Sequence, residues 1–210
     1  MCRTRFLSIF SRVAVVLVAA LLLAGCVKTG TEYVDTADDR GEAVMALDYR
    51  DFQQAAGEMV ESMLTSGAVV DPDGGRRVLM IGRITNDTMQ RIDTDQLLRP
   101  IRADLRRSGK VVVTSAVGLQ GPEDRSSMAV RELRDSAEFD QRTVAGEGQL
   151  IAPDSSLSGS ILQRVITMDD GSDQVEYYFE LALTDINTGL VLWEEQRLIV
   201  KRGSGETVSW

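Results

Sequence analysis

The sequence predicts an α/β fold in which a mixed β-sheet ends in an antiparallel meander and is packed by helices, an α/β sandwich. Residues 77–113 alternate strand, helix and strand, which favours neighbouring parallel strands. Three further strand-like segments between residues 157 and 200 are separated by short turns, which favours the meander. An amphipathic stretch over residues 52–64 supplies a helix to cover the sheet.

The first helix is predicted to follow Asp48 and to end near Ser66 and Gly67. Its apolar residues recur at helical spacing on one face; they are Phe52, Ala55, Ala56, Met59, Val60, Met63 and Leu64. The sequence DPDGG then breaks the chain. Arg77–Ile84 carries apolar residues on both faces, which suits a strand covered on two sides.

A second helix is predicted from a cap at Thr94 to a stop at Gly109. Leu97, Leu98, Ile101 and Leu105 share its apolar face. Pro100 removes a backbone donor there, so the helix either kinks at Pro100 or begins at it. Residues 111–113 form the next short strand.

The middle of the chain is predicted to contain a helix over Glu123–Ala137, after which the sequence is polar to residue 154. Its expected buried residues are Met128, Val130, Leu133 and Phe139. Leu157–Thr167 then reads as a strand, followed by a DDGSD turn. Large apolar residues alternate from Val175 to Leu183, so one face of that strand is buried. The turn at 187–189 leads into the last strand, Leu190–Val200.

The first 25 residues have the three parts of a secretory signal. A basic head contains Arg3, Arg5 and Arg12, the apolar run Val13–Leu23 has 11 residues, and two small residues follow. A membrane-spanning helix needs about 20 apolar residues, so this run is too short to span. The alternative, an uncleaved buried helix, fits the basic head less well.

Leu23-Ala24-Gly25-Cys26 resembles a bacterial lipobox. The resemblance implies that the chain is cut before Cys26, that its thiol takes a diacylglycerol and that the new amine is acylated. Val27 is not the Asp associated with inner-membrane retention, which implies the outer membrane, facing the periplasm. Cys2 lies in the removed part, so no intramolecular disulfide remains possible.

The predicted organisation has four parts. Residues 1–25 are the signal peptide, 26–46 a lipidated flexible tether, 47–202 the globular domain and 203–210 a disordered tail. The tether is polar and acidic and lacks proline. Its residues 27–46 would reach at most about 70 Å when fully extended, and about 25 Å on average as a coil.

Charge and composition exclude several function classes. Removing the three arginines of residues 1–25 leaves 20 basic and 32 acidic side chains, a net charge near −12, which disfavours nucleic acid as a partner. The chain contains no histidine, so Ser–His–Asp and Cys–His catalysis are impossible. The acidic sequences at 71–74 and 169–171 do not match a calcium loop, and 86–88 matches a glycosylation pattern; all three are interpreted as turns. We predict no catalytic residue, metal or cofactor.

A basic helical region stands out in this acidic chain. It contains Arg91, Arg99, Arg102, Arg106 and Arg107. The ordinary interpretation is a solvated helix face, and the alternative is a docking surface for an acidic partner. Trp193, beside a hairpin turn, is either core packing or a recognition residue.

Three segments together resemble the LpoB family of penicillin-binding protein activators. They are VLMIGRITNDTMQRIDTDQL, IRADLRRSGKVVV and YYFELALTDINTGLVLWEEQ, placed behind a lipobox. Related folds, such as the TolB amino-terminal domain and curli-secretion lipoproteins, carry similar turns. The resemblance implies a TolB N-terminal-domain-like fold and a monomeric domain that is not an enzyme. It also implies a regulator that binds a bifunctional penicillin-binding protein and stimulates cell-wall synthesis.

Two other functions stay open from the sequence. One is a structural envelope lipoprotein without catalytic or regulatory activity. The other is an accessory component of a secretion or curli-type assembly, which the shortage of long alternating segments disfavours. The short tether also departs from the long proline-rich tethers of the family's known members.

Overall fold

A computed structural model of the chain describes residues 31, 33–117 and 124–204. Its contacts divide the chain into two units, residues 1–41 and 42–210. In the first unit, Asp38 N donates to Asp35 O at 3.2 Å, and Gly41 N donates to the Asp39 side chain at 2.8 Å. The described part of this unit therefore consists of short turns with exposed side chains, without a helix or strand.

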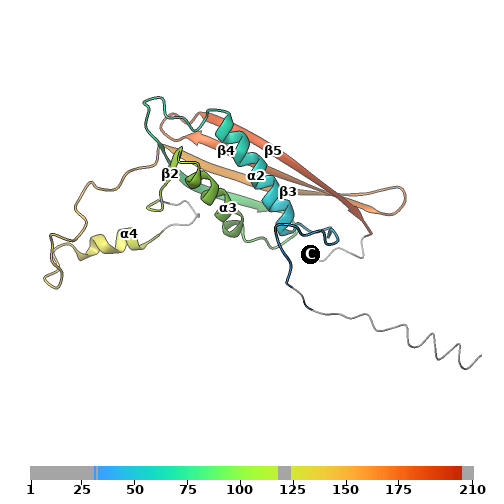
Figure 1. Cartoon of the computed structure of the whole chain (residues 1–210), viewed down its shortest axis with the longest axis horizontal. Coiled ribbons are helices and arrows are strands. Elements are labelled where there is room, and N and C mark those ends of the chain that lie inside the picture. The colour runs from blue at the N-terminus through green and yellow to red at the C-terminus, as the bar shows by residue number, and fades with distance from the viewer. Residues whose placement is uncertain (1–30, 32, 118–123, 205–210) are drawn as a thin grey trace, which may run out of the picture. The chain divides into compact units, whose positions relative to one another are not determined.

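The second unit contains a five-stranded mixed sheet with the strand order β2-β1-β3-β4-β5 (Figure 1). β1 is parallel to β2 and β3, while β3, β4 and β5 form an antiparallel meander. This confirms the predicted α/β fold with a mixed sheet. The elements are α2 (Tyr49–Thr65), β1 (Arg77–Asp87), α3 (Thr94–Arg107), β2 (Val111–Val113), α4 (Ser126–Ala129), the 3-10 helix η2 (Val130–Leu133), β3 (Ser155–Thr167), β4 (Asp173–Asp185) and β5 (Val191–Gly203).

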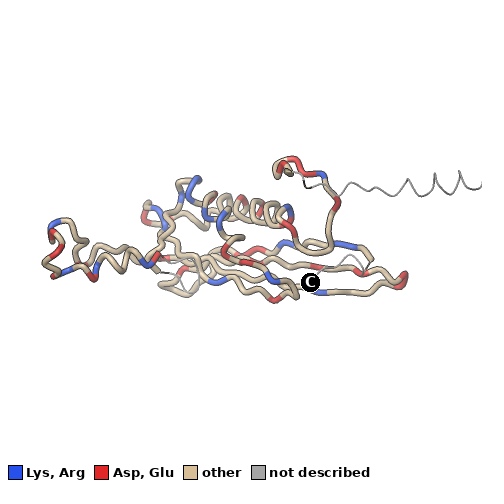
Figure 2. The backbone as a smooth tube through the Cα atoms, turned by 90° about the horizontal axis from the view of Figure 1, so that it is seen from below, with Lys and Arg blue, Asp and Glu red and all other residues tan. Residues whose placement is uncertain are grey.

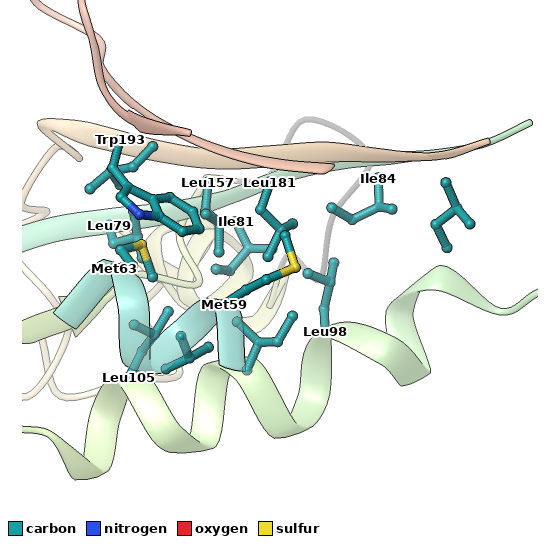
Figure 3. Packing of buried hydrophobic residues seen from close by; sticks show 14 of the residues in the cluster. Met59, Met63, Leu79, Ile81, Ile84, Leu98, Leu105, Leu157, Leu181 and Trp193 are labelled. Atoms are coloured by element: carbon teal, nitrogen blue, oxygen red, sulfur yellow. The ribbon is translucent and has the colours of Figure 1, made fainter. Parts of the chain in front are cut away.

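The main core lies between one face of the sheet and the helices α2 and α3, as Figure 3 shows. Met59 and Met63 from α2 and Leu98 and Leu105 from α3 point toward the sheet. The sheet contributes alternate residues of its strands, because side chains on one face recur at every second position. These buried strand residues include Leu79, Ile81, Leu157, Ile161, Val175, Tyr177, Leu181 and Leu183.

Helix α2 begins where the sequence predicts, because Asp48 caps it. Asp51 N donates to Asp48 Oδ1 at 3.3 Å, and Asp48 N donates to the Asp51 carboxylate at 2.8 Å. This reciprocal pair is a capping box, which satisfies backbone donors that the first turn leaves free. The helix ends at Thr65, with Ser66 as its C-cap, as predicted.

Helix α3 differs from the prediction at its start. The cap is Asp93, whose carboxylate accepts from Asp95 N at 3.0 Å, and Thr94 is the first helical residue. The helix runs through Pro100 and does not begin there. Gly109 follows the C-cap with φ 69°, a conformation that glycine adopts without steric cost.

The residues just before α2 are fixed to the domain. Tyr177 Oη donates to Met45 O at 3.0 Å, Lys201 Nζ donates to Ala46 O at 2.8 Å, and Leu47 N donates to Gln90 Oε1 at 3.1 Å. Met45 and Leu47 are buried in the core. We call residues 42–48 the strap; its contacts reach further toward the N-terminus than the predicted domain start at residue 47.

The segment 124–154 disproves the prediction of a helix over 123–137 with a buried face. Within its described residues it contains only the four-residue α4 and the four-residue η2. Met128, Val130 and Phe139 are 47%, 43% and 47% exposed, and Leu133 is only partly buried. The physical reason is that the segment holds itself together with internal hydrogen bonds, such as Arg134 Nε to Ala145 O at 2.9 Å, and contributes nothing to the main core.

Candidate interaction site

Helix α3 presents two different faces because its apolar and basic residues follow offset helical spacings. Leu98, Ile101 and Leu105 are buried against the sheet. Arg99, Arg102 and Arg106 each follow one of these residues in sequence, so they form a second stripe turned by about 100° per residue. Docking of the apolar face therefore fixes the direction in which the three arginines point.

The three arginines line a groove of about 710 Å³ beside the edge strand β2. Arg76, immediately before β1, contributes a fourth guanidinium to the same groove. The remaining lining residues are Ile81, Ala103, Val111, Val112, Val113, Thr114 and Ser115. We call these eleven residues the arginine groove; no acidic residue is among them.

The charges of the groove are not neutralised within the described part of the chain. The neighbouring Arg107, which does not line the groove, forms an ion pair with Asp104. For Arg76, Arg99, Arg102 and Arg106, no carboxylate lies within 4.0 Å among residues 31, 33–117 and 124–204. Arginine donors in a planar fork match carboxylate and phosphate groups, so the groove can bind an anion.

Arg77, the first residue of β1, is buried and lies close to carboxylates, unlike the four arginines of the groove. Arg77 is 7% exposed and lies 3.7 Å from the Asp185 carboxylate and 3.9 Å from that of Asp154. Hydrogen bonds from the Thr188 backbone are the main cause of the lowered pKa of Asp185, so this carboxylate stays charged beside Arg77. These two carboxylates hold Arg77 at the start of β1, directly after Arg76.

The structure does not place Arg91 with the other predicted arginines. Arg91 lines a separate groove of about 620 Å³, between the N-terminal turns of α2 and α3. Tyr49, Phe52 and Pro100 give this second groove an apolar surface. The sequence grouped Arg91 with the helical arginines because of its proximity in the chain, but it precedes the Asp93 cap and therefore lies outside the helix.

Trp193 lies in the core beside Met63 and Leu79, as Figure 3 shows. It is 9% exposed, and its Nε1 donates to Ser62 Oγ at 3.4 Å. Packing accounts for this residue, and it is not part of the surface proposed below. The predicted lipidation site, Cys26, lies outside the described residues.

Neither a membrane span nor a metal site is found in the described residues. None of their helices is both long and apolar enough to cross a membrane. They also contain no cluster of three or more Cys, Asp or Glu side chains that could hold a metal ion. Of the two grooves described above, the arginine groove carries the stronger positive charge, with four arginines against one in the second groove.

Sequence reasoning found three of the four groove arginines and missed Arg76 and the β2 edge. Arg76 is separated from Arg99 by the whole of β1 and a loop, and only the parallel pairing of β1 and β2 brings it to α3. A charge count along a helix cannot detect such a residue. The turn at 71–75 directly before it was the one available signal.

Comparison with known proteins identifies relatives of this fold. The family model described as "Peptidoglycan-synthase activator LpoB" matches residues 51–199. No curated protein matches the chain significantly.

Solved structures similar to the chain include two LpoB C-terminal domains. The domain from Salmonella enterica is 17% identical, with a TM-score of 0.45, and the one from Escherichia coli is 15% identical, with a TM-score of 0.40; each comparison covers 71% of this chain and 98% of the other. The lipoprotein GNA1162 from Neisseria meningitidis is 13% identical, with coverages of 60% and 83% and a TM-score of 0.36. Because the family model spans well over half of the sequence, this chain belongs to the LpoB family of peptidoglycan-synthase activators.

Proposed function

We propose that this protein is an outer-membrane lipoprotein that binds a bifunctional penicillin-binding protein and stimulates its synthesis of peptidoglycan. The observation that carries the proposal is the family match over residues 51–199, which includes the whole of α3 and the sheet up to Ile199. The family is described as an activator and not as a catalyst. Regulation of a synthase, and through it of cell-wall growth and cell shape, is the corresponding role for this chain.

The arginine groove is the proposed contact surface on the synthase activator. It gathers Arg76, Arg99, Arg102 and Arg106 around one cavity in a chain of net charge −9. Unlike charges attract along the whole approach, so such a surface directs association with an acidic partner surface. Figure 2 shows Lys and Arg as well as Asp and Glu distributed along the described backbone, and the groove gathers four of the arginines without an acidic residue.

Anchoring through Cys26 is the second part of the proposal. Two or more buried acyl chains give a stable anchor, because each buried methylene contributes about 0.8 kcal/mol. Within the strap, the Glu42 carbonyl accepts from Arg50 Nη2 at 3.0 Å. If residues 27–41 act as the tether, they reach at most about 54 Å at about 3.6 Å per residue, so the proposal requires the synthase to extend toward the outer membrane.

The experiment that tests this function is recovery of the partner from the protein's own envelope. The full-length protein, purified from membranes with an affinity tag, should retain a penicillin-binding protein. Addition of the activator to that recovered synthase should raise its rate of glycan polymerisation. If no synthase is recovered under conditions that preserve another envelope complex, the function of a structural lipoprotein becomes the better interpretation.

The anchor has its own test. Replacing Cys26 by Ala should abolish labelling with palmitate and should remove the protein from the outer-membrane fraction. Labelling that survives the substitution would contradict the lipoprotein assignment and leave the activator function to be tested separately.

A further inference from the structure

We propose that the arginine groove binds an extended acidic segment of its protein partner as an added β-strand along the free side of β2. This inference rests on the proposed function only for the identity of the partner, the synthase. It specifies the chemistry and the conformation of the segment that the groove takes. It follows from three features of the groove, namely an open sheet edge, the direction of its backbone groups and the spacing of its arginines.

The open edge comes from the strand order. β2 is the first strand of the sheet, so within the described residues it has a strand neighbour, β1, on one side alone. Val112 is 38% exposed, and residues 111–115 form one wall of the arginine groove. A cavity therefore lies directly beside a sheet edge, where an extended peptide can pair.

The backbone direction shows which groups are free to pair. Thr114 N donates to Leu79 O at 2.9 Å, so the peptide groups of Thr114 face β1. Alternate residues of a parallel strand face opposite sides, so the N–H and C=O of Val113 face the groove. Beyond the end of β2, the Ser115 carbonyl accepts from Asp124 N at 2.9 Å. The backbone groups left for a partner are therefore those of β2 itself, before Ser115.

The spacing of the arginines matches an acidic strand. Along α3, the seven steps from Arg99 to Arg106 rise by about 10 Å, at about 1.5 Å per residue. Side chains on one face of a strand recur about every 6.7 Å, so the first and last of three carboxylates at alternate positions lie about 13 Å apart. Glu or Asp at every second position therefore brings one carboxylate near each of Arg99, Arg102 and Arg106, and Arg76 lines the same groove.

A polypeptide satisfies both parts of the groove at once. The guanidinium groups bind carboxylates, and the edge of β2 offers a peptide donor and acceptor at Val113. An anionic lipid headgroup or a phosphate would satisfy the arginines alone. The acidic strand is thus the occupant that uses every feature of the site.

The test measures binding of a fluorescent peptide of eight residues, alternating Glu and Thr, to the full chain at low ionic strength. Arg106→Gln should weaken binding by at least about fivefold, because charge-assisted hydrogen bonds are lost. Arg107→Gln is the matched control, with the same charge change on the adjacent residue outside the groove. Equal weakening by both substitutions would show general electrostatic attraction and overturn the site.

Backbone pairing is tested on the peptide, which avoids any effect on folding. One peptide carries N-methyl groups on its Glu residues and the other on its Thr residues. Since alternate N–H groups face β2 in an added strand, one of the two should lose at least about tenfold in affinity and the other should not. Equal affinities for the two methylated peptides would overturn strand addition.

Two further outcomes separate this inference from the proposed function. Peptide binding as predicted, with normal stimulation of the recovered synthase by the Arg106→Gln variant, would support the strand site and contradict its role in activation. Loss of stimulation together with equal affinities for the methylated peptides would support the function and overturn strand addition. Binding of vesicles containing an anionic phospholipid that depends on Arg106, without binding of the acidic peptide, would overturn it in favour of a lipid headgroup.

Discussion

The two edges of the sheet differ in whether their positively charged side chains have carboxylate partners. At the β5 edge, Arg197 lies 3.3 Å from Glu58 of α2 and 2.6 Å from Glu195, and Lys201 pairs with Asp51 of α2. At the β2 edge, Arg99, Arg102 and Arg106 of α3 have no carboxylate within 4.0 Å among the described residues. Arg197 and Lys201 on the β5 side are therefore neutralised within the molecule, while these three arginines beside β2 are not.

The two edge strands also differ in how they resist pairing. β5 spans 13 residues, and its pairing with β4 shifts register between Leu183 and Thr184. Charged residues and irregular register are common protections of a long edge against unwanted strand addition. β2 is protected differently, because it is only three residues long and offers few backbone groups to another strand.

The difference between the two sheet edges depends first on the packing of α3 beside β2. Leu105 is fully buried, so Leu105→Ala should lower the free energy of unfolding by about 3 kcal/mol through lost burial and a cavity. Urea unfolding at 25 °C measures this. Arg107→Ala, on the same turn but exposed, is the control. A loss below about 1 kcal/mol for Leu105→Ala would mean that α3 is not held by this side chain.

The domain should lose stability when the ion pair between Lys201 of β5 and Asp51 of α2 is removed. Lys201 and Asp51 have side chains only 11% and 15% exposed, and Lys201 also donates to Ala46 O. Lys201→Met should cost about 2 kcal/mol, because the largely buried Asp51 carboxylate loses its cationic partner and keeps only neutral donors such as Asp48 N. The neighbouring Arg202→Met, which removes an exposed hydrogen bond to Gln174, should cost much less. Similar costs for the two variants would contradict the assignment.

The strap should depend on Tyr177, whose Oη also accepts from Gln90 Nε2 at 2.6 Å. Tyr177→Phe should cost about 1 kcal/mol. Burial raises the pKa of Tyr177 to about 12, so the folded state holds this proton more tightly than the unfolded state. The advantage of the wild type over Tyr177→Phe should therefore be complete below about pH 10 and disappear as the pH rises toward 12.

Chemical unfolding of both proteins across this pH range tests that dependence. The control is Tyr33→Phe, because Tyr33 is fully exposed and should show no such pH-dependent difference from the wild type. A difference between wild type and Tyr177→Phe that stays constant to pH 12 would exclude the buried proton as its cause.

The arginine groove should contribute almost nothing to stability. The double variant Arg102→Gln/Arg106→Gln should change the free energy of unfolding by less than about 0.5 kcal/mol, since no ion pair within the described residues is lost. Its affinity for an acidic partner should nevertheless fall. A destabilisation above about 1 kcal/mol would show that these arginines have a structural role.

The tether should have the smallest effect on the folded domain. Deleting residues 31–41 removes no residue of the core, so the melting temperature should not change. Function in cells should fall, because about 40 Å of contour is lost at about 3.6 Å per residue. An unrelated flexible polar sequence of equal length should restore it. Failure of that replacement would indicate a specific binding sequence in place of a passive tether.

The elements that the sequence predicts well are those with strong periodicity. Helix α2 has both a capping residue and an apolar stripe, and β4 alternates from Val175 to Leu183 with four of its five odd residues buried. The start of α3 was predicted one residue late because Asp93 and Thr94 are adjacent and both residue types form caps. Local chemistry does not decide between them.

The features that sequence patterns miss depend on contacts between distant segments. Met128, Val130 and Phe139 are apolar, but no other layer of the structure covers them, and apolar character alone does not reveal this. Arg76 joins the groove only through the pairing of β1 with β2. Trp193 could be packing or recognition until the position of α2 over β5 was known.

Titration of the recovered synthase with three forms of the full-length protein tests most directly whether the arginine groove binds the synthase. Its glycan polymerisation rate is measured against the wild type, Arg106→Gln and Arg107→Gln at low ionic strength. The groove account predicts that the half-saturating concentration rises by at least about fivefold for Arg106→Gln, with little change for Arg107→Gln. Identical curves for the two variants, with both close to the wild type, would contradict the arginine groove as the surface that binds the synthase.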